Sequence, residues 1–194
     1  MDLVEQLHDE ISHLPGIGKR SARRLLFHFL SNKNTEFDRF IRVLSAAREK
    51  IISCAICFNY SDTQTCKICS SQRRNSQVLC VVERPQDLFA LESTQVFFGQ
   101  YHVLGGVISP IQGIFPDQLK IKELIERVEV GNFNEIILAL NSTVESEATR
   151  LYLKERLGVK VKLSELSRGM PAGGELEFVD RSTIQKALEE RRIQ

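Results

Sequence analysis

The chain has 194 residues, 42% of them hydrophobic, so it can bury a core and form one compact domain with one or two small modules. Its formal net charge of +1 shows that the protein as a whole is neither strongly basic nor strongly acidic. No stretch approaches the roughly 20 consecutive apolar residues of a membrane helix, and the acidic N-terminus MDLVEQLHDE differs from a signal peptide, which predicts a cytoplasmic protein.

Residues 1–53 are predicted to form a small helical module. Apolar residues recur at helical spacing from Val4 to Leu14, and LPGIG then interrupts the helix. A second helix follows directly, and its apolar face comprises Ala22, Leu25, Leu26 and Phe29. A third helix is expected to turn a set of apolar residues inward, namely Phe37, Phe40, Ile41, Leu44, Ala47 and Ile51.

The glycine turn before the second helix is followed by a run of cations. Its two glycines are only two residues apart and follow a helix, which excludes a nucleotide-binding P-loop and favours a helical hairpin. Gly16 and Gly18 would let the backbone approach a phosphate, and Arg20 and Arg24 fall together on the side opposite the core. The predicted DNA-binding residues are Gly16, Gly18, Lys19, Arg20, Arg23 and Arg24.

Two limits apply to this prediction. Arg23 is expected on the flank of the helix, and Lys19 near the buried side at its start. Positions 14 to 33, which also include Lys33, contain no acid, but a charge run alone is more often a solvated helix face. Phosphate contacts of this kind would give affinity with little sequence choice.

Residues 54–77 contain four cysteines with the spacing of a metal site. Cys54, Cys57, Cys66 and Cys69 form C-x2-C-x8-C-x2-C, which predicts one structural zinc ion per chain. Two disulfides are the alternative, but a cytoplasmic chain is reduced. The fifth cysteine, Cys80, lies in the apolar run VLCVVE and is expected to be a buried core residue.

From residue 78 onward, strands and helices alternate, which predicts a mostly parallel sheet covered on both faces. The expected strands lie at 78–83, 101–106, 135–140 and 159–166, and the expected helices at 85–93, 117–130 and 145–158. The last segment contains LEFVD, a Walker B-like apolar run that ends in an acid, and a helix over 181–192. Without a Walker A sequence, Asp180 is better interpreted as the N-cap of this helix.

Three carboxylates follow two of the predicted strands. Glu83 ends the first strand, and Glu145 and Glu147 follow the strand at 135–140, so these acids would meet at one sheet edge and could hold Mg²⁺. The structural alternative is a capping box formed by Ser142 and Glu145.

No other residues complete a catalytic set. Tyr60, Tyr101 and Tyr152 lie in segments without a marker of a nucleophile, and His102 is more often a packed residue than a general base. We therefore assign no catalytic residue.

The order of these motifs resembles the RecR family of bacterial recombination mediator proteins. The resemblance covers essentially the whole chain and is carried by the four cysteines and by LPGIGKRSARRL, VVERPQDLFALE, GQYHVLGGVISPIQGIFPDQL, ALNSTVESEATRLYL and RGMPAGGELEFVDRSTIQKALEER. It implies an α+β chain of several modules: a helix-hairpin-helix DNA-binding domain (1–53), a four-cysteine zinc finger (54–77), a Toprim domain (78–174) and a C-terminal strand and oligomerisation helix (175–194).

The resemblance also implies a function and its partners. Proteins of this family are not known as enzymes, and they form dimers or tetrameric rings that act as clamps on gapped, single-stranded or double-stranded DNA. They work with RecO and RecF to promote recombinase loading in recombinational DNA repair. The family's DNA-contacting basic pair falls on Arg20 and Arg24. Its acidic Toprim edge, a surface for a partner or for Mg²⁺, falls on Glu83, Glu145 and Glu147.

The chain departs from the family pattern at this acidic edge. Ser142 replaces a common proline and Ser146 a common glycine, while Glu145-x-Glu147 stands where catalytic Toprim enzymes have D-x-D. Because glutamate reaches further than aspartate and would move a metal, we expect a partner-binding or structural role for the edge. The alternative function is a Mg²⁺-dependent Toprim nuclease or primase-like enzyme.

Overall fold

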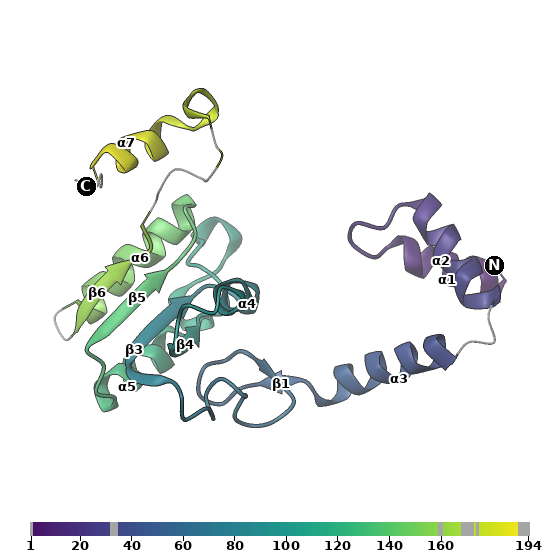
Figure 1. Ribbon diagram of the computed structural model, residues 1–194, viewed down its shortest axis with the longest axis horizontal. Coiled ribbons are helices and arrows are strands. Elements are labelled where there is room, and N and C mark those ends of the chain that lie inside the picture. Colours follow the sequence, from purple (N-terminus) through teal and green to yellow (C-terminus); the bar gives the residue numbers. More distant parts are fainter. Residues whose placement is uncertain (1, 32–34, 159–160, 168–172, 174, 190–194) are drawn as a thin grey trace. The chain divides into compact units, whose positions relative to one another are not determined.

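The computed structural model describes residues 2–31, 35–158, 161–167, 173 and 175–189 (Figure 1). The chain divides into two compact units, Met1–Ile51 and Ile52–Gln194. Within the described residues, no helix is long and apolar enough to cross a bilayer. Several predicted features lie outside this part of the chain, namely Lys33, residues 159 and 160 of the last strand, most of the glycine-rich segment (168–172 and 174) and the final turn of the last helix (190–192).

The first unit consists of three helices, α1 (Leu3–Ser12), α2 (Lys19–Ser31) and α3 (Thr35–Lys50). The Asp2 carboxylate accepts a hydrogen bond from the Glu5 amide at 2.8 Å, and the Glu5 carboxylate accepts one from the Asp2 amide at 3.2 Å. The two bonds together form a capping box that starts α1. The small core between α1 and α2 contains the buried residues Ile11, Ala22 and Leu26. The predicted helical hairpin is therefore present.

The apolar face of α3 differs from the prediction. Phe37 and Ala47 are half-buried, and the Phe37 ring stacks on Phe29 with a centroid distance of 4.5 Å. The other four predicted inward residues are about half exposed, with exposed fractions of 54% for Phe40, 45% for Ile41, 59% for Leu44 and 49% for Ile51. The expectation of a buried face was wrong for the single chain, because helical spacing identifies an apolar stripe but not the surface that covers it.

The second unit begins with the four-cysteine segment. Its short strands β1 (Ile52–Ser53) and β2 (Tyr60–Ser61) pair antiparallel. Partly buried Phe58 and Ile68 of this segment pack against the core cluster on one face of the main sheet. The cysteine segment therefore belongs to the same compact unit as the sheet.

The main sheet contains four parallel strands, as predicted. The strands are β3 (Asn75–Val82), β4 (Gly99–Val103), β5 (Glu135–Ala139) and β6 (Lys162–Glu165), and their order in the sheet is β4-β3-β5-β6. Val82 pairs with Ala139 at the carboxyl ends of β3 and β5, which places Glu83 beside the loop that follows β5.

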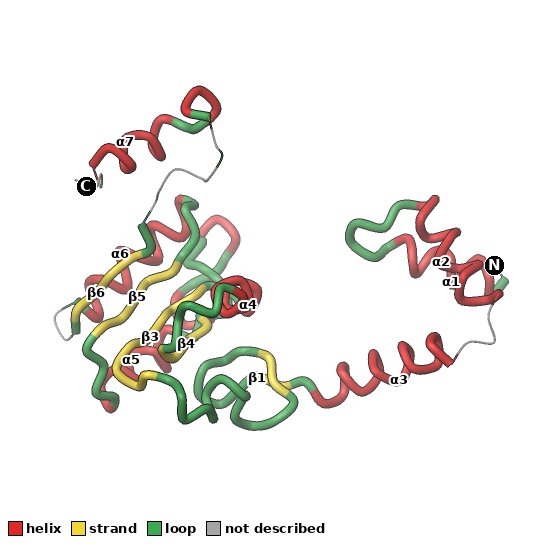
Figure 2. Tube along the Cα trace, in the orientation of Figure 1, coloured by secondary structure: helices red, strands yellow, loops and turns green. Residues whose placement is uncertain are grey.

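Helices cover both faces of this sheet (Figure 2). Helices α5 (Ile121–Val130) and α6 (Val144–Leu157) pack on one face, and α4 (Pro85–Ser93) packs on the other with the cysteine segment. Two short 3-10 turns, η1 (Pro110–Gln112) and η2 (Pro116–Gln118), precede α5, so the predicted helix at 117–130 begins later than expected. The two apolar clusters explain why the strands are continuous apolar runs without alternation.

The C-terminal segment contains a 3-10 turn, η3 (Leu176–Phe178), and helix α7 (Arg181–Glu189). The expected C-terminal strand is thus wrong, because Leu176 and Phe178 are 65% and 78% exposed and pair with no described strand. The interpretation of Asp180 as an N-cap is confirmed, since its carboxylate accepts hydrogen bonds from the Thr183 amide at 3.0 Å and hydroxyl at 2.6 Å.

Candidate metal centre and nucleic-acid interface

The glycine turn between α1 and α2 has the features of a type II turn. The Ile17 amide donates to the Leu14 carbonyl at 3.0 Å, Pro15 occupies the second position, and Gly16 adopts a φ of 79° at the third. Gly18 then starts α2, with its carbonyl accepting from the Ala22 amide at 2.9 Å. A Cβ at Gly16 or Gly18 would meet no atom within 4 Å, so the turn is open on its outer side.

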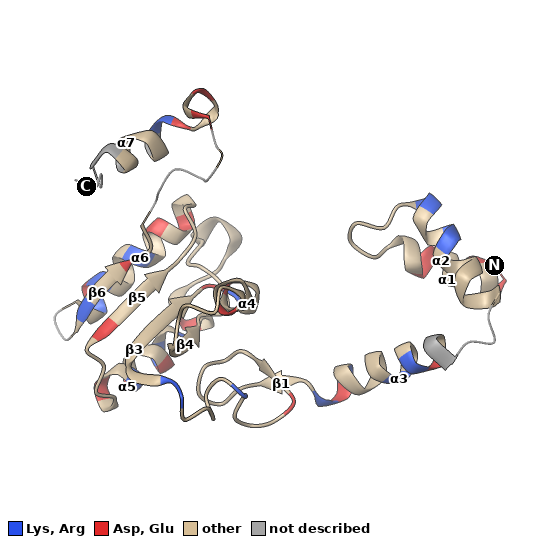
Figure 3. Ribbon diagram, viewed as in Figure 1, with Lys and Arg blue, Asp and Glu red and all other residues tan. Residues whose placement is uncertain are grey.

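The cations of α2 are solvent-exposed. Figure 3 shows the lysine and arginine positions on this helix in blue. Lys19, Arg20, Arg23 and Arg24 all have exposed side chains, and none of them forms an ion pair with another described residue. The expectation that Lys19 lies near the buried side was wrong, because the first position of a helix projects beyond the core contact. The arrangement leaves several charge-assisted donors available to an anion.

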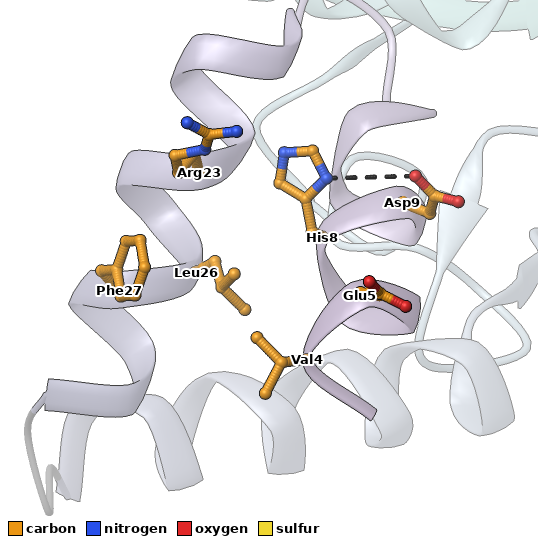
Figure 4. Close-up of a pocket in the computed structure, with 7 residues that line it drawn as sticks. All are labelled: Val4, Glu5, His8, Asp9, Arg23, Leu26 and Phe27. Atoms are coloured by element: carbon orange, nitrogen blue, oxygen red, sulfur yellow. Dashed lines mark ion pairs between the residues drawn. The ribbon is translucent and has the colours of Figure 1, made fainter. Parts of the chain in front are cut away.

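Arg23 has different surroundings from Arg20 and Arg24. It lines a cavity of about 540 Å³ between α1 and α2, together with Val4, Glu5, His8, Asp9, Leu26 and Phe27. Figure 4 shows Arg23 on α2 and the two acids on α1, where Asp9 also lies 3.9 Å from the His8 ring. The acids reduce the local positive charge around Arg23, whereas Arg20 and Arg24 do not line this cavity.

The four predicted cysteines meet in one cluster. Each Sγ atom lies within 4.8 Å of the other three, and the Cys57 and Cys66 sulfurs are 3.6 Å apart. In a tetrahedral thiolate site with metal–sulfur bonds of about 2.3 Å, the sulfurs stand roughly 3.8 Å apart. Three of the cysteines are buried and Cys69 is half-buried, so the cluster could hold a metal ion in a closed shell.

Backbone amides prepare these sulfurs for a negative charge. The Cys66 amide donates to the Cys54 sulfur at 3.3 Å, and the Cys69 amide donates to the Cys66 sulfur at 3.5 Å. A separate hydrogen bond joins the side chains of Cys69 and Cys57. It lowers the pKa of the Cys57 thiol to about 5 and raises the pKa of the Cys69 thiol. One thiolate is therefore stabilised by the cluster itself, and a bound cation would stabilise the remaining ones.

The three carboxylates at the sheet edge are not arranged as a metal site. Glu83 is only 5% exposed, and its carboxylate accepts hydrogen bonds from the Asn141 amide at 2.7 Å, the Asn141 side chain at 2.8 Å and the Ser146 hydroxyl at 2.5 Å. Protein donors thus occupy the oxygens that a magnesium ion would need. Among the described residues, the cysteine cluster is the only group of three or more His, Cys, Asp or Glu side chains that converges on one point.

A buried arginine supplies a positive charge beside this edge. Arg150 on α6 is 2% exposed and forms an ion pair with Glu147 and another with Glu165, whose carboxylate lies 3.3 Å from its Nε atom. It also donates at 3.2 Å to the carbonyls of Leu140 and Asn141, where the loop leaves β5. Arg150 therefore links three parts of the unit, namely the loop after β5, helix α6 and the end of β6.

The cap of α6 differs from the predicted capping box. Thr143, and not Ser142, is the N-cap, and its hydroxyl accepts from the Ser146 amide at 3.1 Å. Glu145 lies in the first turn of α6 and is half-buried. The sequence placed Ser146 at this edge only as a departure from the family pattern, and it gave no indication of the hydrogen bond from Ser146 to Glu83 or of the role of Arg150.

Three further side chains that the sequence analysis considered are packed, whereas Tyr60 is 59% exposed. His102 is fully buried, its Nε2 atom lies 2.7 Å from the Lys120 carbonyl, and burial lowers its pKa to about 4. Burial raises the pKa of the Cys80 thiol to about 12, as fits a core residue. Tyr101 is also buried and donates its hydroxyl to Glu92 at 3.0 Å.

Family models match three parts of the chain. A model described as "RecR, helix-hairpin-helix" matches residues 4–48, a Toprim domain model matches residues 77–165, and a model described as "RecR, C-terminal" matches residues 169–192. The order of these matches follows the order of the structural elements: the helical hairpin, the parallel sheet, and the segment that contains α7.

The chain is also similar to curated proteins along nearly its whole length. It is 44% identical to the Recombination protein RecR of Thermobifida fusca, covering 97% of this chain and 96% of the relative. It is 47% identical to the protein of that name from Acidothermus cellulolyticus and 44% identical to that from Mycobacterium tuberculosis, with 98% of this chain covered in both and 96% and 97% of the relatives.

Proposed function

Because this chain belongs to the RecR family of recombination proteins, we propose that it is a non-enzymatic, DNA-binding mediator of recombinational repair. In this proposal it forms an oligomeric clamp on gapped, single-stranded or double-stranded DNA and acts with RecO and RecF in the loading of recombinase. The observation that carries the proposal is the open glycine turn followed by the exposed, unpaired cations of α2.

We infer that DNA contacts α2 through its phosphates. Arg20 and Arg24 are one helical turn apart, so both guanidinium groups can reach the same backbone. The turn at Gly16 and Gly18 has no side chains that would keep a phosphate away from the amides at the start of α2. Such contacts would be insensitive to base sequence and strongly dependent on salt.

The exposed apolar residues of α3 support self-association. A single copy offers few phosphate contacts, whereas several linked copies bind a polymer with a much higher effective concentration. The exposed face of α3 and the exposed Leu176 and Phe178 near the other end of the chain are two apolar regions that copies of the chain could cover. We therefore propose a homo-oligomer, a dimer or a tetrameric ring, that encloses DNA in a cytoplasmic complex.

We propose that the cysteine cluster holds one zinc ion in a structural role. Four thiolates in a tetrahedral arrangement are typical of structural zinc, and such a shell leaves no open position for a substrate. In a short segment with only two-residue strands, metal binding would supply folding energy that a small apolar core does not.

For the acidic edge we propose a partner-binding or structural role without Mg²⁺. Ser146 and Asn141 already satisfy Glu83, and Arg150 already pairs with Glu147. Magnesium prefers carboxylate and water ligands that are free to adopt octahedral geometry, so it would have to break this network. The network therefore argues against a Toprim nuclease or primase-like activity.

The proposal is tested with full-length protein on gapped and supercoiled DNA. Replacing Arg20 and Arg24 together by Ala should weaken binding and reduce the slope of log affinity against log salt by about 0.9 for each lost phosphate contact. The matched control replaces Lys122 and Lys162 by Ala, since these are exposed cations of the other unit and the charge removed is the same. Unchanged affinity and salt slope in the Arg20 and Arg24 variant would contradict the proposed DNA contact.

The same DNA substrates test the absence of catalysis. We expect neither strand cleavage nor synthesis when Mg²⁺ is added to the wild-type protein. Metal-dependent turnover that disappears in Glu145→Ala would overturn the non-enzymatic part of the proposal. Its DNA-binding part would be unaffected by that result, because the two arginines lie in the other unit.

A further inference from the structure

Arg127 on α5 reaches from the sheet side of the second unit to the cysteine segment. Its Nη1 atom donates to the Tyr101 carbonyl at 2.7 Å and to the Ile56 carbonyl at 3.2 Å, and its Nη2 atom donates to the Gln100 side chain at 2.6 Å. Ile56 is the second of the two residues between Cys54 and Cys57 and directly precedes Cys57. One guanidinium thus bonds to the first cysteine turn and to the β4 strand.

The guanidinium of Arg127 lies beside the cysteine segment and has no carboxylate partner among the described residues. Arg127 is half-buried. Burial lowers its pKa, while the negative charge of each of the four cysteines acts in the opposite direction. A divalent ion bound by four thiolates has a net charge of about −2, so a nearby cation stabilises the loaded site.

We propose that Arg127 is the positioning residue of the metal centre, which holds the first cysteine turn against β4 and balances the charge of the metal–thiolate cluster. The inference rests on the proposed zinc site and extends it from the ligands to the residue that joins them to the sheet. Groups outside the ligand shell that orient or neutralise it commonly change metal affinity by about 10- to 100-fold.

Two further contacts join the first cysteine turn to β4. The Val103 amide at the end of β4 donates to the Cys57 carbonyl at 2.8 Å. The Phe58 ring, next to Cys57, packs edge-on against His102 with a centroid distance of 5.2 Å. Because Arg127 and Val103 bind to neighbouring carbonyls of the same cysteine turn, metal occupancy and the order of β4 and α5 should change together.

The first experiment measures zinc release from purified full-length variants to a chromogenic chelator. We expect Arg127→Gln to release zinc about 10- to 100-fold faster than the wild type, because the cation and its three hydrogen bonds are lost together. Arg127→Lys keeps the charge without the planar fork and should release zinc at an intermediate rate. Lys122→Gln is the matched control, since its side chain is 84% exposed on the same helix, and it should behave as the wild type does.

The outcomes separate this inference from the proposed zinc site. A wild-type protein without zinc would refute the zinc site, whereas a zinc-loaded wild type with equal release from Arg127→Gln would overturn the role of Arg127 alone. If Arg127→Gln loses stability but keeps the wild-type release rate, Arg127 is only a structural contact of β4, and the inference is wrong.

A second measurement needs no variant and applies even if Arg127→Gln does not fold. Hydrogen–deuterium exchange of the wild type, before and after chelation, should show faster exchange in Tyr101–Val103 and in α5 when zinc is removed. The α6 helix packs on the opposite face of the sheet from the cysteine segment, so its exchange rates should change less. Unchanged protection of β4 and α5 after chelation would contradict the coupling.

Discussion

The cysteine cluster and the acidic edge lie in the same unit, and each gathers several acidic side chains, but the protein balances their charges differently. Around Glu83 and Glu147 the chain supplies a hydroxyl, an amide side chain and the buried Arg150. Around the four thiols it supplies backbone amides and, at one side, Arg127. Protein donors already satisfy the carboxylates of the acidic edge, whereas the thiol cluster has the spacing of a site that could hold a metal ion.

If the proposed zinc site is correct, this difference means that the number of potential ligands does not by itself decide whether a site binds a metal. A cluster whose lone pairs already accept hydrogen bonds from buried donors gains little from a cation and would lose those bonds. A cluster of thiols, which are weak hydrogen-bond acceptors, gains metal–sulfur bonds instead. The hydrogen-bond donors around a group of potential ligands therefore say as much about metal binding as the ligands themselves.

The strongest test of the comparison removes one ligand of the cysteine cluster. Cys66→Ser should reduce zinc content from one ion per chain to nearly none and unfold the cysteine segment, because structural zinc contributes about 10 kcal/mol or more of binding free energy in small zinc domains. Metal analysis and circular dichroism measure the two effects. Cys80→Ala is the control and should retain zinc, since Cys80 lies in the sheet core. Full zinc content in Cys66→Ser would contradict the four-thiolate site.

The next largest effect is expected when the internal cation of the acidic edge is removed. Arg150→Gln leaves Glu147 and Glu165 without their buried partner and should lower the free energy of unfolding by about 3 to 5 kcal/mol. Urea denaturation measures this loss, and Arg156→Gln, an exposed change on the same helix, should stay within about 0.5 kcal/mol of the wild type. If Mg²⁺ raises the free energy of unfolding of the wild-type protein, the carboxylates of the acidic edge are not fully satisfied by protein donors. That result would contradict the proposed difference between the edge and the cysteine cluster.

The pH dependence of the free energy of unfolding tests the role of His102, which packs against Phe58 beside the cysteine cluster. Burial holds the pKa of His102 at about 4, below its ordinary value of 6.5, so the folded state binds fewer protons than the unfolded state between these values. The stability that His102 contributes is complete above pH 6.5 and is lost as the pH falls toward 4, by about 3 kcal/mol in total.

The matched comparison for this prediction is His102→Leu, which should lack that part of the pH dependence. The thiols and carboxylates titrate in both proteins, so their contributions cancel in the difference between the two stability curves. Parallel curves for the wild type and His102→Leu between pH 4 and 6.5 would show that His102 does not carry the effect.

The smallest expected effect concerns the hydroxyl at the acidic edge. Ser146→Ala removes the 2.5 Å hydrogen bond to Glu83 but leaves both Asn141 donors, so we expect a loss of about 1 to 2 kcal/mol in thermal or urea unfolding. The exposed change Ser93→Ala controls for loss of a hydroxyl from a helix. A loss equal to that of the control would mean that Ser146 does not help to satisfy Glu83.

The sequence was sufficient for the features that depend on local spacing. The cysteine pattern, the helical hairpin and the alternation of strands and helices in the main sheet follow from residues that are neighbours in the chain. The structure confirms all three. The two internal networks could not be predicted in the same way. Ser146 meets Glu83 from 63 residues away and Arg127 meets Ile56 from 71 residues away, so only the folded sheet brings these groups together.

Surfaces were the other feature that the sequence left open. The apolar stripe of α3 was predicted correctly as a stripe but wrongly as buried, because hydrophobic periodicity does not identify the covering partner. The helix caps were predicted with mixed success, because Asp180 was identified correctly but Ser142 was chosen in place of Thr143. Both N-terminal signals were visible, but the choice between Ser142 and Thr143 depended on backbone angles that only the structure provides.

The contacts at β4 have a consequence for solubility. β4 is an edge strand of the sheet, and on its outer side the Tyr101 carbonyl binds Arg127 while the Val103 amide binds the cysteine turn. Unpaired groups on an edge strand are a template for pairing with strands of other molecules. If the cysteine cluster holds zinc as proposed, removing the metal should uncover this edge, and we expect the zinc-free protein to aggregate more readily than the zinc-loaded one.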